Sequence, residues 1–258
     1  MGTTAQAIAS SSSAFGYITE AVWGNSMVIG QFNMNDKADK LMFVIGNGTG
    51  NTSSTRKNIF TVDVNGNVMA TGTVSSSTGA DYAEYFEWKD GNPDNEDRVG
   101  YIVCLDGDKI VKANTGDDIL GICSGTAMVL GDSAESYWNK KFVTDDFGRI
   151  VYGEQQTQCE PIINKTTGEV IKEAWVETSY SPLVSPSYNP DIPYTKRSER
   201  PEWQIVGMMG KLYVRDDGSC VVNGYADVKD GIATKASSKT NMRVMERVTD
   251  NIVRVLMK

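Results

Sequence analysis

Short apolar runs, each closed by turn-forming residues, recur along the chain and predict a protein made mainly of β-strands. In the first part, the segments "MVIGQFN" from Met27 and "FVIGNGT" from Phe43 resemble each other, and a glycine closes each apolar run. The regular interval between these two segments predicts a repeat of strands and turns.

A β-hairpin is expected directly after this repeat. Val62, Val64 and Val68 flank Asn65-Gly66 in the segment "FTVDVNGNVMATG". Asn-Gly favours a tight hairpin turn, because such a turn needs positive φ at both central positions. The strands up to about Thr73 contain few large apolar residues. A small number of large apolar residues favours an intertwined oligomeric β-structure, in which partner chains complete the core.

The composition changes from Asp81 onward. Aromatic residues and cysteines enter, and turn residues separate strand-like runs such as "GYIVCL", "LGICSGTAMVLG" and "IVGMMGKLYVRDDG". This pattern predicts a compact, mostly antiparallel β-domain with long loops. Most prolines lie between Glu154 and Glu202, which predicts an extended excursion of the chain. The composition therefore divides the chain into a part up to about Thr73 and a part from Asp81 onward.

A helix is predicted at the C-terminal end of the sequence. Met245, Val248, Ile252 and Val255 recur at steps of three and four, which places them on one helical face. A terminal strand over "NIVRVLM" is the alternative, because β-branched residues lower helix propensity. Symmetry mates in a trimer or a higher oligomer could cover this apolar stripe. Packing onto the chain's own domain is the other possibility.

Composition and charge exclude several classes of function. Of 258 residues, 40% are hydrophobic and 22% charged, which indicates a folded chain rather than a disordered one. We expect no membrane span, because no apolar run approaches the roughly 20 residues that one requires. The net charge of −8 and the lack of a basic cluster argue against nucleic-acid binding.

The sequence contains no histidine, which excludes Ser-His-Asp and Cys-His catalysis. The four cysteines form no CxxC pair, so we expect small buried residues rather than a zinc site. The loop "DGNPDNED" from Asp90 begins like a calcium site. However, Asn95 and Tyr101 replace the glycine and the bidentate glutamate that such a site requires. A solvated acidic turn is the better interpretation, and we expect neither a metal nor a cofactor.

One segment does suggest chemistry. In "SSSTGADYAEYFEWKDG" from Ser75, a hydroxyl run directly precedes carboxylates set among aromatic rings. A Ser or Thr hydroxyl can attack the carbonyl before it when a carboxylate with a raised pKa moves the protons. Asp81 and Glu84 suit that role. The alternative is an ordinary strand, with its rings directed inward and its acids outward.

The chain from about Thr78 to Lys258 resembles the autoproteolytic intramolecular-chaperone domain found at the C-terminal end of bacteriophage tail-fibre, tailspike and neck-appendage proteins. The resemblance rests on "GADYAEYFEWKDGNPDNEDRVG", "KANTGDDILGICSG", "DDFGRI", "RSERPEWQIVGMMGKLYVRDDGSC" and "MRVMERVTDNIVRVLMK". Residues 1–77 look like the β-helical or head-repeat end of a trimeric fibre shaft, so the resemblance implies two domains, residues 1–77 and residues 78–258.

This resemblance implies a division of labour between the two domains. The C-terminal domain would form a homotrimer, align three upstream shaft chains and then cut itself away. A clamp of this kind removes the slow step of registering three chains. Its removal leaves a product that unfolds very slowly. The protein would belong to a virion and be assembled in the cytoplasm of the bacterial host.

The resemblance also implies the residues of the site. The scissile bond would be Ser77–Thr78, with Thr78 supplying the hydroxyl and with Asp81 and Glu84 moving the protons. The grouping of the family with glutamic peptidases favours Glu84 over Asp81. Ser75, Ser76 and Ser77 are further candidates for the attacking residue.

Two other functions compete with self-cleavage. A non-cleaving structural trimer tip could bind a host-surface glycan through aromatic faces. The candidates for such stacking are Trp138, Tyr188, Tyr194 and Trp203. A glycan hydrolase would need a pair of carboxylates flanking a cleft, and no spacing in the sequence marks such a pair.

Overall fold

The computed structural model describes residues 2–134 and 140–258. The chain divides into two compact units, Met1–Ser77 and Thr78–Lys258. Within the described ranges there is no α-helix, and the irregular stretches contain two 3-10 turns, Lys37–Asp39 and Arg197–Glu199. None of these described helical turns is long and apolar enough to cross a membrane. The expected β-rich fold is confirmed.

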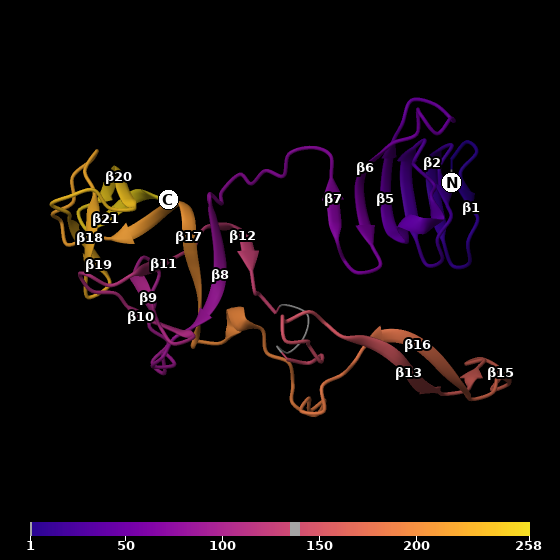
Figure 1. The fold of residues 1–258 in the computed structure, drawn as a ribbon. Helices are drawn as coiled ribbons and strands as arrows, with labels where there is room; N and C mark the ends of the chain where they lie inside the picture. The colour runs from indigo at the N-terminus through magenta and orange to yellow at the C-terminus, as the bar shows by residue number, and fades with distance from the viewer. Residues whose placement is uncertain (1, 135–139) are drawn as a thin grey trace. The chain divides into compact units, whose positions relative to one another are not determined.

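The first unit combines parallel strands stacked in register, β2, β4 and β5, with antiparallel strands, β6 and β7, that continue the sheet (Figure 1). Its main sheet runs in the order β2, β4, β5, β6, β7, with a separate short parallel pair β1–β3. The repeat seen in the sequence is confirmed, because Val28 pairs with Val44 and Gly30 with Gly46. The strands are β1 (Gln6–Ala7), β2 (Ser13–Tyr17), β3 (Glu20–Ala21), β4 (Met27–Gln31), β5 (Leu41–Asn47), β6 (Asn58–Asp63) and β7 (Val68–Ala70).

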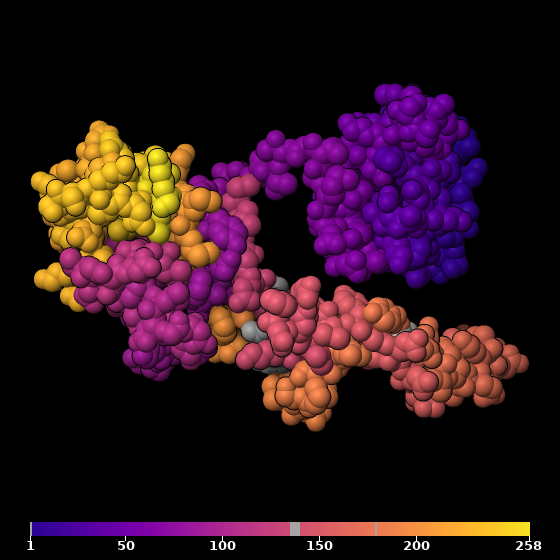
Figure 2. Space-filling model, in the orientation of Figure 1, coloured from indigo at the N-terminus to yellow at the C-terminus, as the bar shows by residue number. Residues whose placement is uncertain are grey.

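Glycine is required where these strands stack. Gly16 and Gly30 have φ of 126° and 98°, which side chains rarely adopt. A Cβ atom on Gly16 would lie 1.9 Å from the carbonyl oxygen of Gly30, and one on Gly30 would lie 2.2 Å from that of Gly46. The recurring glycines therefore let successive backbones approach closely. The stack packs into one block, coloured indigo to purple in Figure 2.

The predicted hairpin is formed by β6 and β7, which pair antiparallel. Its turn is longer than a two-residue turn, because the strands end at Asp63 and resume at Val68. Gly66 has a positive φ of 82°. The Asp63 carboxylate closes the loop by accepting hydrogen bonds from the backbone N–H groups of Asn65 and Asn67 at 2.8 and 2.9 Å.

The second unit is built on an eight-stranded sheet. The order is β10, β9, β11, β17, β21, β20, and β8 pairs with both β17 and β12. All of these pairs are antiparallel except β8 with β12. The strands are β8 (Asp81–Glu87), β9 (Ile102–Asp106), β10 (Lys109–Lys112), β11 (Ile119–Cys123), β12 (Ala127–Gly131), β17 (Trp203–Arg215), β20 (Met242–Thr249) and β21 (Ile252–Met257).

Two buried clusters hold this unit together. The larger one gathers side chains from β9, β11 and β17 to β21, including Ile102, Leu212 and Met242. The smaller one surrounds Trp88, with Val206 and other residues of the sheet. A further hairpin, β18 (Ala226–Lys229) with β19 (Ile232–Lys235), contributes to the larger cluster. Early and late strands of the unit thus pack into one body (Figure 2).

The predicted C-terminal helix is wrong, and the strand alternative is confirmed. The segment forms the hairpin β20–β21, with Thr249 pairing with Ile252. Val253, Val255 and Met257 are buried at alternating positions, whereas Val248 is exposed. The period of burial is therefore two rather than three to four. The β-branched valines fit a pleated sheet, and they favour a strand over a helix in this segment.

The proline-containing stretch forms an extended two-stranded ribbon. Its strands β13 (Tyr152–Cys159) and β16 (Trp175–Pro182) pair along their whole length. A short pair, β14 (Ile162–Ile163) with β15 (Val170–Lys172), lies at its tip. Many of its apolar side chains are exposed, such as Ile171 and Tyr180. The predicted excursion of the chain is this ribbon together with the loops that follow it.

Candidate functional site

The two predicted carboxylates lie on β8, which is held between β12 and β17. Alternate residues of β8 point to opposite faces of the sheet. Asp81, Ala83 and Tyr85 are buried, whereas Tyr82 is exposed and Glu84 half-buried. Asp81 and Glu84 are three residues apart and therefore face opposite sides. The structure places both on one rigid strand but does not bring them to one face.

Asp81 is only 3% exposed, so the expectation that the acids of this strand point outward is wrong for this residue. One carboxylate oxygen, Oδ1, accepts a hydrogen bond from the Thr126 hydroxyl at 3.2 Å. The other, Oδ2, is buried without a hydrogen-bond partner among the described residues. Gly207 leaves room for it, because a Cβ there would lie 2.7 Å from Oδ2. A buried oxygen of this kind is costly unless a donor reaches it.

Glu84 lies on the more accessible face and has a tyrosine as its partner. The Tyr82 hydroxyl donates a hydrogen bond to Oε1 of Glu84. This hydrogen bond to the Glu84 carboxylate raises the pKa of Tyr82 above its ordinary value. On β12, Gly131 pairs with Glu84, and a Cβ there would lie 2.9 Å from Cγ of Glu84. A glycine beside it thus leaves space for the glutamate side chain.

The hydroxyl run lies at the boundary between the two units. Residues 75–78 are exposed and belong to no strand. Immediately afterwards the chain joins the sheet, since the Ala80 N–H donates to the Thr126 carbonyl at 3.3 Å. Gly79 approaches β12 so closely that a Cβ would lie 2.7 Å from Cα of Met128. The segment before β8 is therefore accessible at Ser77 and Thr78 and anchored from Gly79 onward.

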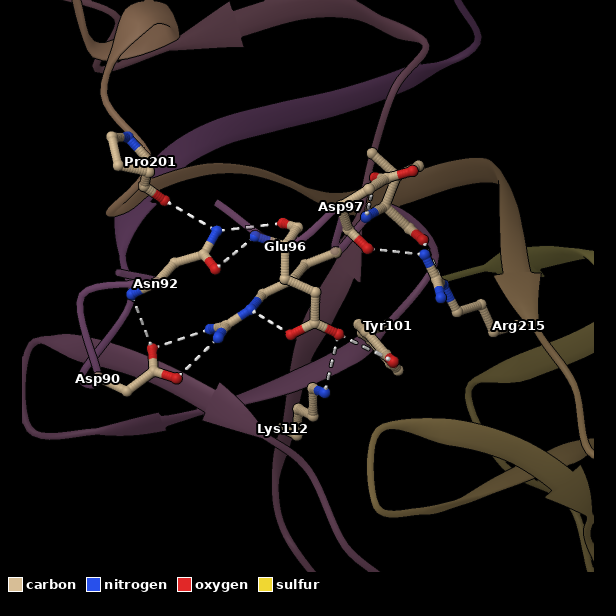
Figure 3. A network of polar contacts seen from close by, with 10 residues as sticks. Asp90, Asn92, Glu96, Asp97, Tyr101, Lys112, Pro201 and Arg215 are labelled. Atoms are coloured by element: carbon tan, nitrogen blue, oxygen red, sulfur yellow. Dashed lines mark hydrogen bonds and ion pairs between the residues drawn. The ribbon is translucent and has the colours of Figure 1, made fainter. Parts of the chain in front are cut away.

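The acidic loop that follows β8 is a network of ion pairs (Figure 3). The Arg98 side chain is 8% exposed, and it donates to both oxygens of Asp90 at 2.8 Å and to Glu96 at 3.0 Å. Its guanidinium lies 4.5 Å from the centre of the Trp88 ring. Arg98 holds the pKa of Asp90 below its ordinary range.

Asn92 completes this network. Its side chain accepts from the Glu96 N–H at 2.9 Å and donates to the carbonyls of Glu96 and Pro201 (Figure 3). Residues 93–97 are exposed, as expected for a solvated acidic turn, and these hydrogen bonds and ion pairs tie the turn to the domain. Within residues 2–134 and 140–258, no group of acidic residues or cysteines is arranged to hold a metal ion.

Cysteines and aromatic residues outside β8 offer less chemistry. Cys104, Cys123 and Cys220 are buried as expected, whereas Cys159 is half-buried. Burial raises the pKa of Cys220 to about 12, which disfavours a reactive thiolate. Of the aromatic residues considered for glycan stacking, Trp138 lies outside the described residues. The Arg197 guanidinium lies 3.8 Å from the centre of the Trp203 ring and covers one of its faces.

Comparison with known proteins identifies the family. The model of the Peptidase_G2 family, described as the IMC autoproteolytic cleavage domain, matches residues 25–253. The chain therefore belongs to this family.

It is 36% identical over 183 residues to the pre-neck appendage protein of Bacillus phage B103, a match covering 70% of this chain and 19% of that protein. The corresponding protein of Bacillus phage phi29 is 36% identical over 173 residues, covering 66% and 18%. The matched region thus spans about a fifth of these relatives.

Solved structures show the same fold. The crystal structure of the pre-mature bacteriophage phi29 gene product 12 superposes with a TM-score of 0.66 at 24% identity, over 100% of this chain and 29% of that one. The structure of its C-terminal fragment gives a TM-score of 0.52 at 30% identity, over 69% of this chain and 100% of the fragment. The expected resemblance to a phage autoproteolytic chaperone domain is confirmed.

Proposed function

We propose that this chain is the C-terminal part of a phage neck appendage or fibre, in which residues 78–258 act as a chaperone and then cut themselves off. The observation that carries the proposal is the placement of the hydroxyl run. It is exposed between two compact units, and the carboxylate-bearing strand β8 follows within a few residues. Family membership and the neck-appendage relatives support the same function.

The proposed reaction breaks the peptide bond between Ser77 and Thr78. Oγ1 of Thr78 attacks the Ser77 carbonyl carbon and gives its proton to a carboxylate. The C–N bond then breaks, the Thr78 amine takes up a proton, and an ester links the two residues. Water opens the ester, leaving a carboxylate on Ser77 and a free amino group and hydroxyl on Thr78. Ser75, Ser76 and Ser77 remain alternative attacking residues, each on the bond before it.

We assign the proton transfer to Glu84 and a supporting role to Asp81. Glu84 lies on the accessible face of β8 and has space beside Gly131. Asp81 faces the interior and holds Thr126, whose carbonyl anchors the segment before β8. In this proposal Glu84 moves the protons and Asp81 fixes the chain. This differs from the sequence-based hypothesis, in which both carboxylates moved protons.

The chaperone part of the proposal is a homotrimer whose first unit is the end of a β-helical shaft. Phe15, Ile29 and Ile45 lie in one row across three parallel strands, on the face opposite the buried valines. Phe15, Met27 and Tyr17 are each more than 40% exposed in the single chain. Exposed apolar rows on this scale mark an interaction surface. Two further copies of the same stack would cover it, and the upstream shaft would continue it.

Variants of the full chain test this function directly. Glu84→Gln should abolish cutting, seen as one band on a denaturing gel, while the particle keeps the mass of a trimer in light scattering. Glu87→Gln, on the same strand but paired with Lys109, is the matched control and should be cut normally. Equal cutting of both variants would remove Glu84 from the mechanism.

The trimer has its own test. Ile29→Asp places a charge in the middle of the apolar row and should reduce the particle to a monomer or an aggregate, because a buried unpaired charge is costly. Ser54→Asp, in an exposed turn, is the control and should leave the mass unchanged. A trimer that tolerates Ile29→Asp would contradict assembly through this face.

A further inference from the structure

Tyr82 occupies the centre of the accessible face beside the candidate glutamate. In register, it lies between Val129 of β12 and Met209 of β17. These two flanking side chains are 50% and 59% exposed, and Tyr82 itself is 38% exposed. A tyrosine hydroxyl in this position can face either solvent or a neighbouring polar group. In this structure it is directed at Glu84.

The contact follows from the geometry of the strand. Tyr82 and Glu84 are two residues apart on β8, so their side chains share a face. The tyrosine hydroxyl donates to one carboxylate oxygen, and Gly131 keeps the adjoining space clear. A glutamate side chain has several rotatable bonds, and a hydrogen bond from a stiff ring is an efficient way to fix its orientation.

Few charges compete for this glutamate. The flanking strand β12 and the part of β17 from Trp203 to Gly210 contain no ionisable side chain. Just beyond β12, Asp132 is paired with Arg197. Tyr82 is therefore the neighbouring group best placed to fix the orientation of the Glu84 carboxylate.

We propose that Tyr82 is a positioning residue for self-cleavage, whose hydroxyl orients the Glu84 carboxylate by donating a hydrogen bond to it. This inference rests on the proposed function. The hydrogen bond also acts on the tyrosine, because the Glu84 carboxylate raises the pKa of Tyr82. The hydroxyl stays protonated at neutral pH and remains available as a donor.

The test is Tyr82→Phe in the full chain, which keeps the ring between Val129 and Met209 and removes only the hydroxyl. Cutting should slow about tenfold, the scale expected for loss of one hydrogen bond to a charged group. The wild-type rate should also fall in the alkaline range where the Tyr82 hydroxyl loses its proton and can no longer donate, and that fall should be absent from Tyr82→Phe. Tyr213→Phe, an exposed tyrosine of β17, is the control and should cut as the wild type does.

A second measurement guards against misfolding as the explanation. In the Glu84→Gln variant, ultraviolet titration should show one tyrosine ionising at lower pH than in the wild type, because the acceptor charge is gone. That change should be absent when Tyr82→Phe is added. A normal rate and an unchanged alkaline fall in Tyr82→Phe, with Glu84→Gln inactive, would overturn the role of Tyr82 alone. A wild-type chain that never cuts would overturn the proposed function and this inference with it.

Discussion

The two units of the chain are stabilised in different ways. In the first, the buried cluster consists of small side chains, Ala14, Ala21, Val28 and Val44. In the second, a larger cluster includes Ile102, Leu212 and Met242, and Trp88 anchors another. Hydrophobic stabilisation scales with the apolar area buried, so the first unit gains much less of it from its own core.

This difference suggests which unit depends on the other. Small residues and glycines let the strands of the first unit stack closely, but its apolar row of Phe15, Ile29 and Ile45 is only partly covered. In the proposed homotrimer, other copies would cover that row and add the stability that this stack lacks by itself. On the same proposal, the second unit, which has the larger core, would fold first and bring the copies together. Its later removal by the proposed self-cleavage would cost the assembled stack little, because such a stack would unfold slowly.

Gly30→Ala should have the largest effect, because it should disrupt the first unit and leave the second intact. The new Cβ would lie 2.2 Å from a backbone oxygen of Gly46, at a φ of 98°, so the strands cannot stay in register. We expect residues 13–47 to lose hydrogen-exchange protection while the second unit keeps its own. Gly72→Ala, which meets nothing within 4 Å, is the control in the same unit. Retained protection in Gly30→Ala would contradict the close stacking.

A smaller but still large effect is expected from Trp88→Ala in the second unit. Loss of a fully buried aromatic side chain costs about 3 to 5 kcal/mol. Calorimetry should show a lower melting temperature for the second unit. Phe147→Ala, at a residue that is 85% exposed, should change the unfolding free energy by less than about 0.5 kcal/mol. Equal effects of the two substitutions would argue against the core around Trp88.

The smallest effect concerns the acidic loop and its dependence on pH. Because Arg98 lowers the pKa of Asp90, their pairing stabilises the fold above the ordinary carboxyl range, and this contribution is lost as the pH falls through the lowered pKa. The Asp90 side chain is 59% exposed, so Asp90→Asn should cost only about 1 kcal/mol at neutral pH.

Denaturant unfolding at several pH values would check this prediction. The cost of Asp90→Asn should shrink as the pH falls from about 4, where the carboxyl of the unfolded chain takes up a proton, through the lowered pKa of the folded chain. Asp94→Asn, in the same loop and exposed, is the matched control and should be nearly neutral. A cost that is constant across the acid range would contradict the pairing.

Local patterns predicted the strands of the first unit well, because the two Val-Ile-Gly runs pair with each other residue by residue. The C-terminal hairpin was harder. In "RVMERVTDNIVRVLM" the valines fit both a helical and a strand period, and only β-branching separates the two. The burial of Asp81 could not be predicted, since it depends on Thr126 and Gly207, which are distant in sequence. The contact between Tyr82 and Glu84 follows from their spacing once β8 is known to be a strand.

The most direct test of the central claim is intact mass spectrometry of the freshly purified full chain, under denaturing conditions and over a time course. Self-cleavage predicts two fragments whose masses sum to that of the chain plus one water, broken between Ser77 and Thr78. The Glu84→Gln variant should keep one unbroken mass throughout. An unbroken wild-type chain that persists for days would contradict the account and leave the protein as a structural trimer tip.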